Sequence, residues 1–236
     1  MDRADTIRTL PTPADVADAG AAALVERLGR AITQRGKASV VLSGGGTPKA
    51  VYERLATVHA RAIDWSRVTV YFGDERAVEP SHPDSNFRMV DSAMLTRLTF
   101  AAVHRIPGEL GAPAAAAAYE RLVPDAFDVC LLGMGADGHT ASLFAPLTHW
   151  PGLVAATIAP PPFAVTDRIS LTPQAFARAG SALAFITGAD KQSMLRRVLA
   201  EREADGPRTL PMSFVRPRGI DFILDQAATI PTVCAS

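Results

Sequence analysis

The sequence FDVCLLGMGADGHTASLFAP, at residues 127–146, joins an apolar run to a cluster of glycines, one carboxylate and one imidazole. The run 127–132 is interrupted only by Asp128, a pattern typical of a central strand covered on both faces of a parallel sheet. Such sheets bind ligands beyond the carboxyl ends of their strands. Asp137 and His139 fall there, on a glycine-rich loop, and imidazole is the side chain best suited to move protons near neutral pH. We therefore interpret His139 as a catalytic candidate, with a structural histidine as the alternative.

The same loop also matches the pattern G-x-G-x-x-G of dinucleotide-binding proteins, through Gly133, Gly135 and Gly138. That pattern requires a helix that begins at the third glycine and an acidic residue about 20 positions further on. Here Pro146 follows shortly, and the next acidic residue is Asp167. We reject the nucleotide interpretation and expect no cofactor.

Strand and helix patterns alternate along the rest of the chain. Strands are predicted at 39–42, 68–72, 101–106, 127–132, 153–158, 168–171, 182–186 and 220–224. Helices are predicted over residues 13–36 and 113–122, and one further helix includes residues 194–198. Three more helices are predicted to begin at Thr47 and Pro48, at Asp84 or Ser85, and at Thr172 and Pro173. This order predicts an α/β fold: a mostly parallel, open, twisted, Rossmann-like sheet with helices on both faces, in one domain over residues 1–236.

The composition restricts the partners and the compartment. Lys plus Arg equals Asp plus Glu at 24 each, so the net charge favours neither nucleic acid nor an anionic membrane. The N-terminus lacks the apolar core of a signal peptide, and no apolar run is long enough to span a bilayer. Cys130 lies in an apolar strand and Cys234 near the end, so we expect free thiols and a reducing cytoplasm. The subunit number stays open between a monomer and a small homo-oligomer.

A second glycine cluster lies between the strand 39–42 and the helix expected to begin with Thr47 as N-cap and Pro48 as first residue. Free N–H groups and the helix dipole make such a junction an anion site, and a plain tight turn is the alternative. It is not a P-loop, because Lys49 follows Pro48. Two glycine-rich strand ends in one chain favour a phosphate site. Its residues are Ser43, Gly44, Gly45, Gly46 and Thr47.

Charged residues follow two further predicted strands. The triplet Asp74, Glu75 and Arg76 is either a solvated loop or part of a site. Lys191 is either a point-charge phosphate ligand or an ordinary helix lysine. His82 is expected to hold its own loop rather than to act as a base, and His104 to lie in or beside sheet packing.

Five motifs occur in this order: LSGGGTP at 42–48, GDER at 73–76, GMGADGHTASLF at 133–144, RISLTP at 168–173 and TGADK at 187–191. Together they resemble the 6-phosphogluconolactonases, of the group that includes the glucosamine-6-phosphate deaminases. The resemblance covers about residues 38–225 and implies the fold of that group. It implies that the loop through Thr47, with Arg168 and Lys191, holds a sugar phosphate. It also implies that Asp137, His139, Asp74 and Arg76 lie at the reacting ring.

The chain departs from the deaminases in two places. They show Asp-Glu-Tyr where this chain has Asp-Glu-Arg at 74–76, and Glu-Pro after the histidine block, where this chain has Leu-Phe-Ala-Pro at 143–146. Lactone hydrolysis therefore fits better than ring opening and deamination. Ala145 also departs from the lactonases, which usually run from Phe directly to Pro. The stretch 210–218 matches loosely, and no role is carried onto it.

The resulting hypothesis is hydrolysis of a phosphorylated sugar lactone, 6-phospho-D-glucono-1,5-lactone. His139 would act as general base, Arg76 and loop N–H groups would hold the oxyanion, and Asp137 and Asp74 would orient the histidine and substrate. No metal is expected, because the histidines and cysteines lack ligand spacing. The rivals are an isomerase or deaminase that uses Asp74 as proton carrier, and a non-catalytic sugar-phosphate sensor. A sensor of the regulator type would carry a DNA-binding helix pair, and only one helix precedes residue 39.

Overall fold

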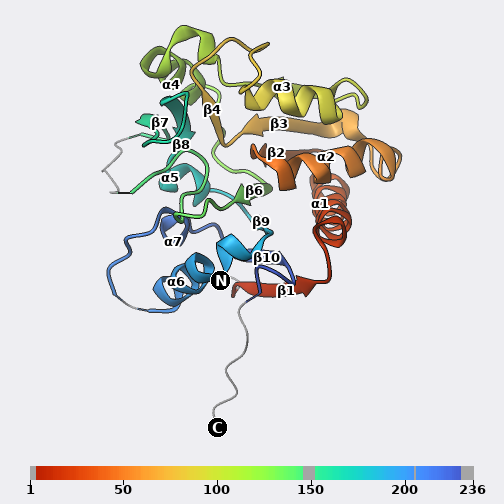
Figure 1. Cartoon of the computed structure of the whole chain (residues 1–236). Helices are drawn as coiled ribbons and strands as arrows, with labels where there is room; N and C mark the ends of the chain where they lie inside the picture. The colour runs from red at the N-terminus through yellow and green to blue at the C-terminus, as the bar shows by residue number, and fades with distance from the viewer. Residues whose placement is uncertain (1–3, 146–151, 205, 230–236) are drawn as a thin grey trace.

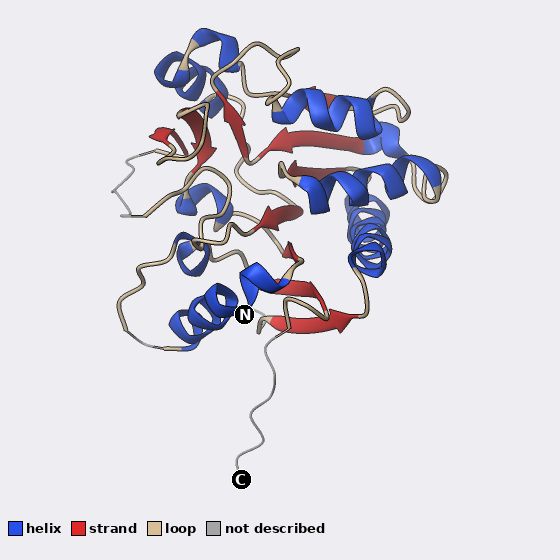
Figure 2. Ribbon diagram, in the orientation of Figure 1, coloured by secondary structure: helices blue, strands red, loops and turns tan. Residues whose placement is uncertain are grey.

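The computed structural model describes residues 4–145, 152–204 and 206–229, which leaves Pro146 and Cys234 outside the described residues. A seven-stranded sheet has the order β1-β10-β9-β6-β2-β3-β5, and every neighbouring pair is parallel (Figure 2). This confirms the predicted α/β sheet. Its strands are β1 (Thr6–Leu10), β2 (Ala38–Leu42), β3 (Val68–Phe72), β5 (Ala102–His104), β6 (Val129–Gly133), β9 (Ala182–Ile186) and β10 (Ile220–Asp225).

Helices cover both faces of the sheet, as predicted. Successive residues of a strand point to opposite faces. On β10, Asp221 pairs with Arg27 of α1 (Pro13–Arg35), whereas the guanidinium of Arg202 on α6 (Gln192–Glu203) lies 5.8 Å from the ring centroid of the next residue, Phe222. Figure 1 shows α1 and α6 on opposite sides of β10. The remaining α-helices are α2 (Gly46–Thr57), α3 (Asn86–Val90), α4 (Ala112–Glu120), α5 (Pro173–Phe176) and α7 (Pro211–Phe214), with a π-helix at Asp91–Leu95 and 3₁₀ turns at Trp65–Arg67, Gly108–Leu110 and Ala189–Lys191.

Local signals placed α1 correctly. The side chain of Thr12 accepts a hydrogen bond from Asp15 N and the Asp15 carboxylate accepts from Thr12 N, which forms a capping box. Gly36 ends the helix with φ of 74°, a conformation that glycine adopts without steric cost. His104 also lies where expected, on β5 with its ring centroid 4.9 Å from that of Tyr71.

Two features of the large sheet differ from the predictions. Strand β1 was not predicted, because this edge strand is mostly exposed and carries little apolar signal. Thr47 was wrongly predicted as an N-cap: α2 begins at Gly46 after Gly45, whose φ is 103°. The backbone of glycine makes this tight entry, and the Thr47 hydroxyl instead hydrogen-bonds that of Thr187 at 2.8 Å.

A second, antiparallel sheet has the order β4-β8-β7, with β4 (Asp74–Arg76), β8 (Asp167–Leu171) and β7 (Val154–Ile158). The predicted strand 168–171 is correct, but it belongs to this sheet. The charged triplet is not a solvated loop, since it forms a mostly buried strand whose Arg76 lies opposite Arg168. This pairing brings two distant motifs to one place.

Among the described residues, every helix is either too short or too polar to cross a bilayer. The large sheet supplies most of the apolar core, and Cys130 within it is a buried free thiol. Burial raises the pKa of that thiol, so it behaves as an inert apolar side chain.

Candidate active site

The loops after β2 and β6 meet in the middle of the large sheet. The chain passes from β2 outward to β3 and β5, then returns to β6 on the other side of β2 and continues to β9 and β10. The strand order therefore reverses between β2 and β6, and ligands of open α/β sheets bind at such a reversal. The glycine-rich loops that the sequence singled out are the two loops at this point.

A pocket of about 260 Å³ lies between these loops. It brings together all but one of the candidate residues, which come from the loops after β2 and β6, from β4 and β8, and from the turn before α6. The exception is Asp137, which lies behind His139 and contacts it. The candidates that line the pocket are Ser43, Gly44, Gly45, Gly46, Thr47, Asp74, Arg76, His139, Arg168 and Lys191.

The turn after β6 presents a histidine and carboxylate pair. His139 Nδ1 lies 2.5 Å from Asp137 Oδ1, and the same oxygen accepts a hydrogen bond from His139 N at 3.2 Å. Partial burial opposes the charged carboxylate, but His139 and its hydrogen bonds outweigh burial and lower the pKa of Asp137. An ionised Asp137 only accepts, so Nδ1 carries a hydrogen, and in the neutral form of the imidazole the lone pair is then on Nε2. Residues 139–145, after Gly138, form turns and not the helix that the dinucleotide-binding pattern requires, so the structure supports rejecting the nucleotide interpretation.

Two aromatic rings lie beside the imidazole of His139. Its centroid lies 4.8 Å from that of Phe144 and 5.7 Å from that of Phe163, which follows the proline run 160–162. Gly135 N donates to His139 O at 2.8 Å and closes the turn. The sequence did not indicate either phenylalanine, because aromatic residues in loops carry no pattern of their own.

We expect Gly135→Ala to impair the histidine without unfolding the protein. A Cβ at this position would lie 2.1 Å from His139 Nδ1 and 2.6 Å from Asp137 Oδ1. Both are ends of side chains and can move, so the free energy of unfolding should change little while kcat falls at least about tenfold. Kinetics and thermal unfolding check this. Gly206→Ala, where an added Cβ meets nothing within 4 Å, is the matched control. An unchanged kcat in Gly135→Ala would contradict the expectation.

The loop after β2 is fixed from behind by a buried tyrosine. Tyr52 OH accepts a hydrogen bond from Ser43 N at 2.9 Å and donates to Ser43 O at 2.7 Å. Burial raises the pKa of Tyr52, so the hydroxyl keeps its proton. The first residues of α2, Gly46 and Thr47, line the pocket, so an anion bound there would lie at the positive end of the helix dipole.

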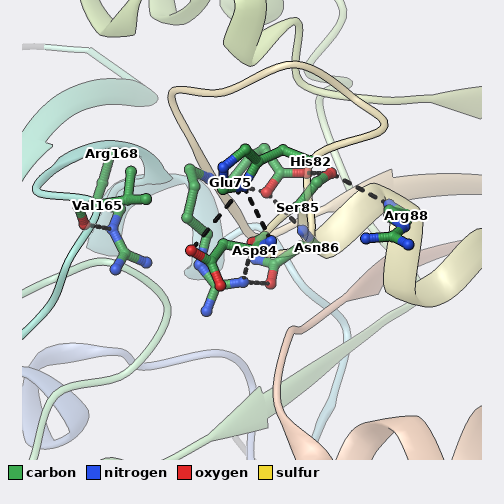
Figure 3. Close-up of polar contacts among 9 residues, drawn as sticks. Glu75, His82, Asp84, Ser85, Asn86, Arg88, Val165 and Arg168 are labelled. Atoms are coloured by element: carbon green, nitrogen blue, oxygen red, sulfur yellow. Dashed lines mark hydrogen bonds and ion pairs between the residues drawn. The ribbon is translucent and has the colours of Figure 1, made fainter.

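Two arginines face each other across β4 and β8. Arg168 is only 5% exposed, donates from Nε to Val165 O at 2.9 Å, and lies 5.3 Å from the ring centroid of Phe163. Burial, and then the charge of Arg76, lowers the pKa of Arg168. Arg76 Nη1 donates to Asp84 O and Asn86 Oδ1, each at 2.6 Å, while its buried Nε has no partner among the described residues. Figure 3 shows Arg168 beside the polar contacts at the start of α3.

These two cations form no ion pair with a carboxylate among the described residues. Like charges opposite each other on paired strands are destabilising, and buried charges require partners. A bound anion would relieve both costs. Lys191 supplies a third positive charge to the pocket, with Nζ 2.8 Å from Asp190 Oδ2.

Asp74 is held by two buried side chains that the sequence did not indicate. Its Oδ2 accepts from Ser142 Oγ at 2.6 Å and its Oδ1 from Asn86 Nδ2 at 3.1 Å. Ala141, next to Ser142, has φ of 49°, a strained conformation for a residue with a side chain. The histidine loop therefore reaches across to β4 through Ser142.

Glu75 has a structural role, unlike its neighbours in the triplet. It is 2% exposed and accepts hydrogen bonds from Asn86 N and Phe87 N, both at 2.7 Å, and from Ser85 Oγ at 3.1 Å. Burial outweighs these bonds and raises its pKa. Ser85 is the N-cap of α3, one of the two residues predicted, and His82 holds its loop by accepting from Asp84 N.

The loosely matching stretch 210–218 supports the histidine turn. Met212 N donates to Gly138 O at 3.1 Å. Glu201 of α6 holds this segment, because its carboxylate accepts from Thr209 N, Thr209 Oγ1, Leu210 N and Ser213 Oγ at 2.6–3.0 Å. These bonds outweigh desolvation and lower the pKa of Glu201 to about 2.

We expect the stabilising effect of Glu201 to depend on pH. The folded pKa of about 2 lies below the ordinary value of 4.5, so the contribution is fully present above pH 4.5 and disappears as the pH falls toward 2. Glu201→Gln should lower the free energy of unfolding at neutral pH, and its difference from wild type should shrink at acidic pH. Urea unfolding across this range measures it, with Glu203→Gln, exposed on the same helix, as control. A difference that does not vary with pH would contradict this.

The fold and site together define a Rossmann-like α/β protein with a histidine and carboxylate pair beside a pocket that is lined by a glycine-rich loop at a helix N-terminus. The family model of the glucosamine-6-phosphate isomerases/6-phosphogluconolactonase matches residues 11–224, and the chain belongs to this family. It is 38% identical over 221 residues to a 6-phosphogluconolactonase of Synechocystis sp., covering 86% of this chain and 88% of that protein.

Solved structures agree with this assignment. A 6-phosphogluconolactonase from Thermotoga maritima superposes with a TM-score of 0.83 at 28% identity, covering 94% of this chain and 100% of the other. A monomeric glucosamine-6-phosphate deaminase superposes with a TM-score of 0.82 at 18% identity, covering 94% and 98%. That second similarity concerns the fold alone.

Proposed function

We propose that this protein hydrolyses 6-phospho-D-glucono-1,5-lactone to 6-phosphogluconate, the second step of the oxidative pentose phosphate pathway. The observation that carries the proposal is the 2.5 Å contact of Asp137 with Nδ1 of His139, a histidine that lines one pocket together with a glycine-rich loop and three cationic side chains. The relatives named as 6-phosphogluconolactonases support the choice of substrate.

In the proposed reaction, His139 moves the proton. Its Nε2 takes a proton from water as the water oxygen attacks the lactone carbonyl carbon. The tetrahedral intermediate then collapses, the bond from that carbon to the ring oxygen breaks, and Nε2 returns the proton to the ring oxygen. Asp137 holds the ring tautomer and stabilises the transient imidazolium, a role that its lowered pKa supports because it keeps the carboxylate charged.

The cationic groups divide between the two ends of the substrate. The N–H groups at the start of α2, with Arg168 and Lys191, bind the phosphate. Arg76 stabilises the oxyanion that forms at the carbonyl, and one well-placed donor contributes about 3–4 kcal/mol to such a step. Asp74, held by Ser142 and Asn86, orients the substrate hydroxyls.

The deciding experiment follows freshly generated lactone at neutral pH with and without the protein, because the lactone also opens spontaneously. Acceleration above the spontaneous rate supports the proposal, and decay at the spontaneous rate with folded protein contradicts it. Release of ammonia from glucosamine 6-phosphate would instead support a deaminase that uses Asp74. Tight binding of 6-phosphogluconate without catalysis would support a sensor.

A further inference from the structure

Asn86, the first residue of α3, lies at the centre of the polar contacts in this pocket. Its side chain is buried, since the residue is only 1% exposed, and it lines the pocket. Its backbone is fixed, because Asn86 N donates to Glu75 Oε1 at 2.7 Å. Figure 3 shows Asn86 among Glu75, Asp84 and Ser85, with Arg168 across from them.

The amide of Asn86 joins two groups of opposite charge. Its Oδ1 accepts from Arg76 Nη1 at 2.6 Å, and its Nδ2 donates to Asp74 O at 3.0 Å and Asp74 Oδ1 at 3.1 Å. An amide turned by 180° would point its donors at the guanidinium and its oxygen at the carboxylate. The charges on either side therefore determine a single orientation of the amide, and the amide in turn fixes both charged groups.

The same amide lies against the anion-binding loop. A Cβ added to Gly44 would lie 2.1 Å from Asn86 Oδ1 and 2.6 Å from its Cγ. This close approach requires a glycine at position 44. One side chain thus contacts the loop after β2 and holds both functional residues of β4.

We propose that Asn86 is a positioning residue that acts through Arg76 and Asp74. It holds the Arg76 guanidinium at the site of the developing oxyanion and the Asp74 carboxylate toward the substrate. This inference rests on the proposed lactonase function. It assigns to Asn86 an effect on turnover that a residue which only starts a helix would not have.

A double-mutant cycle tests whether Asn86 acts through Arg76. Asn86→Ala is expected to lower kcat at least about tenfold with KM changed less than about threefold, since the interaction matters in the transition state. Arg76→Ala should lower kcat by more, and the loss in the double variant should be smaller than the product of the two single losses, because only the part of the Asn86 effect that acts through Asp74 remains. Losses that multiply in the double variant would overturn the inference.

A matched control separates positioning from support of the helix. Ser85→Ala removes the N-cap bond from Arg88 N to Ser85 Oγ, at 3.2 Å, and the bond from Ser85 Oγ to Glu75, at 3.1 Å, but it removes no partner of the Asn86 side-chain amide. It should lower thermal stability while kcat stays within about threefold of wild type. If Ser85→Ala and Asn86→Ala lost kcat equally, Asn86 would have only a structural role.

The isosteric variant Asn86→Asp gives a second readout. It leaves no cavity at position 86, so it does not depend on whether the protein folds with a smaller side chain there. A carboxylate at position 86 can still accept from Arg76, but above its pKa it repels Asp74. When the two carboxylates share one proton, that proton replaces the lost amide donor. The activity of this variant relative to wild type should therefore fall as pH rises. A ratio that does not vary with pH would count against the proposal.

A structure of Asn86→Ala tests the inference even if the wild type fails to hydrolyse the lactone. Arg76 is expected to leave Asp84 O and turn toward solvent, and an unmoved guanidinium would overturn the positioning role. If Arg76 moves but wild type leaves lactone decay unchanged, the proposed function alone fails.

Discussion

His139→Ala is expected to lower kcat by about 10²–10⁴-fold, the usual contribution of general acid and base catalysis. KM should change little, because the loop before α2, Arg168 and Lys191 are the residues proposed to contact the phosphate, and this variant leaves them unchanged. The measurement is the enzyme-dependent rate of lactone decay after the spontaneous rate is subtracted. The loss should be larger than that of Gly135→Ala, which displaces the imidazole but does not remove it.

The matched control is His59→Ala. His59 follows the end of α2 that is far from the pocket, so its removal tests the general effect of losing an imidazole. Its kcat should equal that of wild type. An active, folded His139→Ala protein would remove His139 from the catalytic role, and the search for a base would then move to Asp74.

Arg168→Met is expected to lower kcat/KM by about 10²-fold, mainly through KM, since losing one partner of a buried charged contact costs about 2–5 kcal/mol. The substituted protein should nevertheless be no less stable without ligand. Removing this guanidinium relieves its repulsion with Arg76 and the cost of a buried charge without a carboxylate. A site that holds two unpaired cations for an anion gains affinity for that anion and loses stability in the unliganded protein.

Thermal unfolding with and without inorganic phosphate checks this pair of effects. Phosphate should raise the midpoint of wild type and raise it less in Arg168→Met, because a ligand stabilises only the state that binds it. Arg168→Lys keeps the charge but loses the planar guanidinium and its contact with Phe163. The rise of its midpoint with phosphate should therefore lie between those of wild type and Arg168→Met. Arg67→Met, at an exposed ion pair, is the control. A destabilised Arg168→Met with normal KM would contradict the anion site.

Local patterns explain how much of the site could be predicted. The apolar runs that became β2, β3, β6 and β9 are continuous because both faces of these strands are buried, and each is followed by the residues at its carboxyl end. Since parallel strands bring those ends to one edge, the sequence predicted that the loops at 43–47 and 133–139 lie at the same edge, and the strand order made them neighbours. The edge strand β1 has no such signal and was missed.

The sequence by itself determined the parallel sheet and the two glycine loops, and it singled out His139 as the catalytic candidate. It could do so because strand burial, capping and glycine conformations depend on residues close together in the chain. Only the tertiary structure decided that Arg76 faces Arg168, that Ser142 binds Asp74 from 68 positions away, and that Asn86 joins Arg76, Asp74 and Gly44. These contacts depend on the pairing of β4 with β8 and on the packing of three separate loops. Such pairings join segments distant in sequence and leave no periodicity in the sequence of either partner.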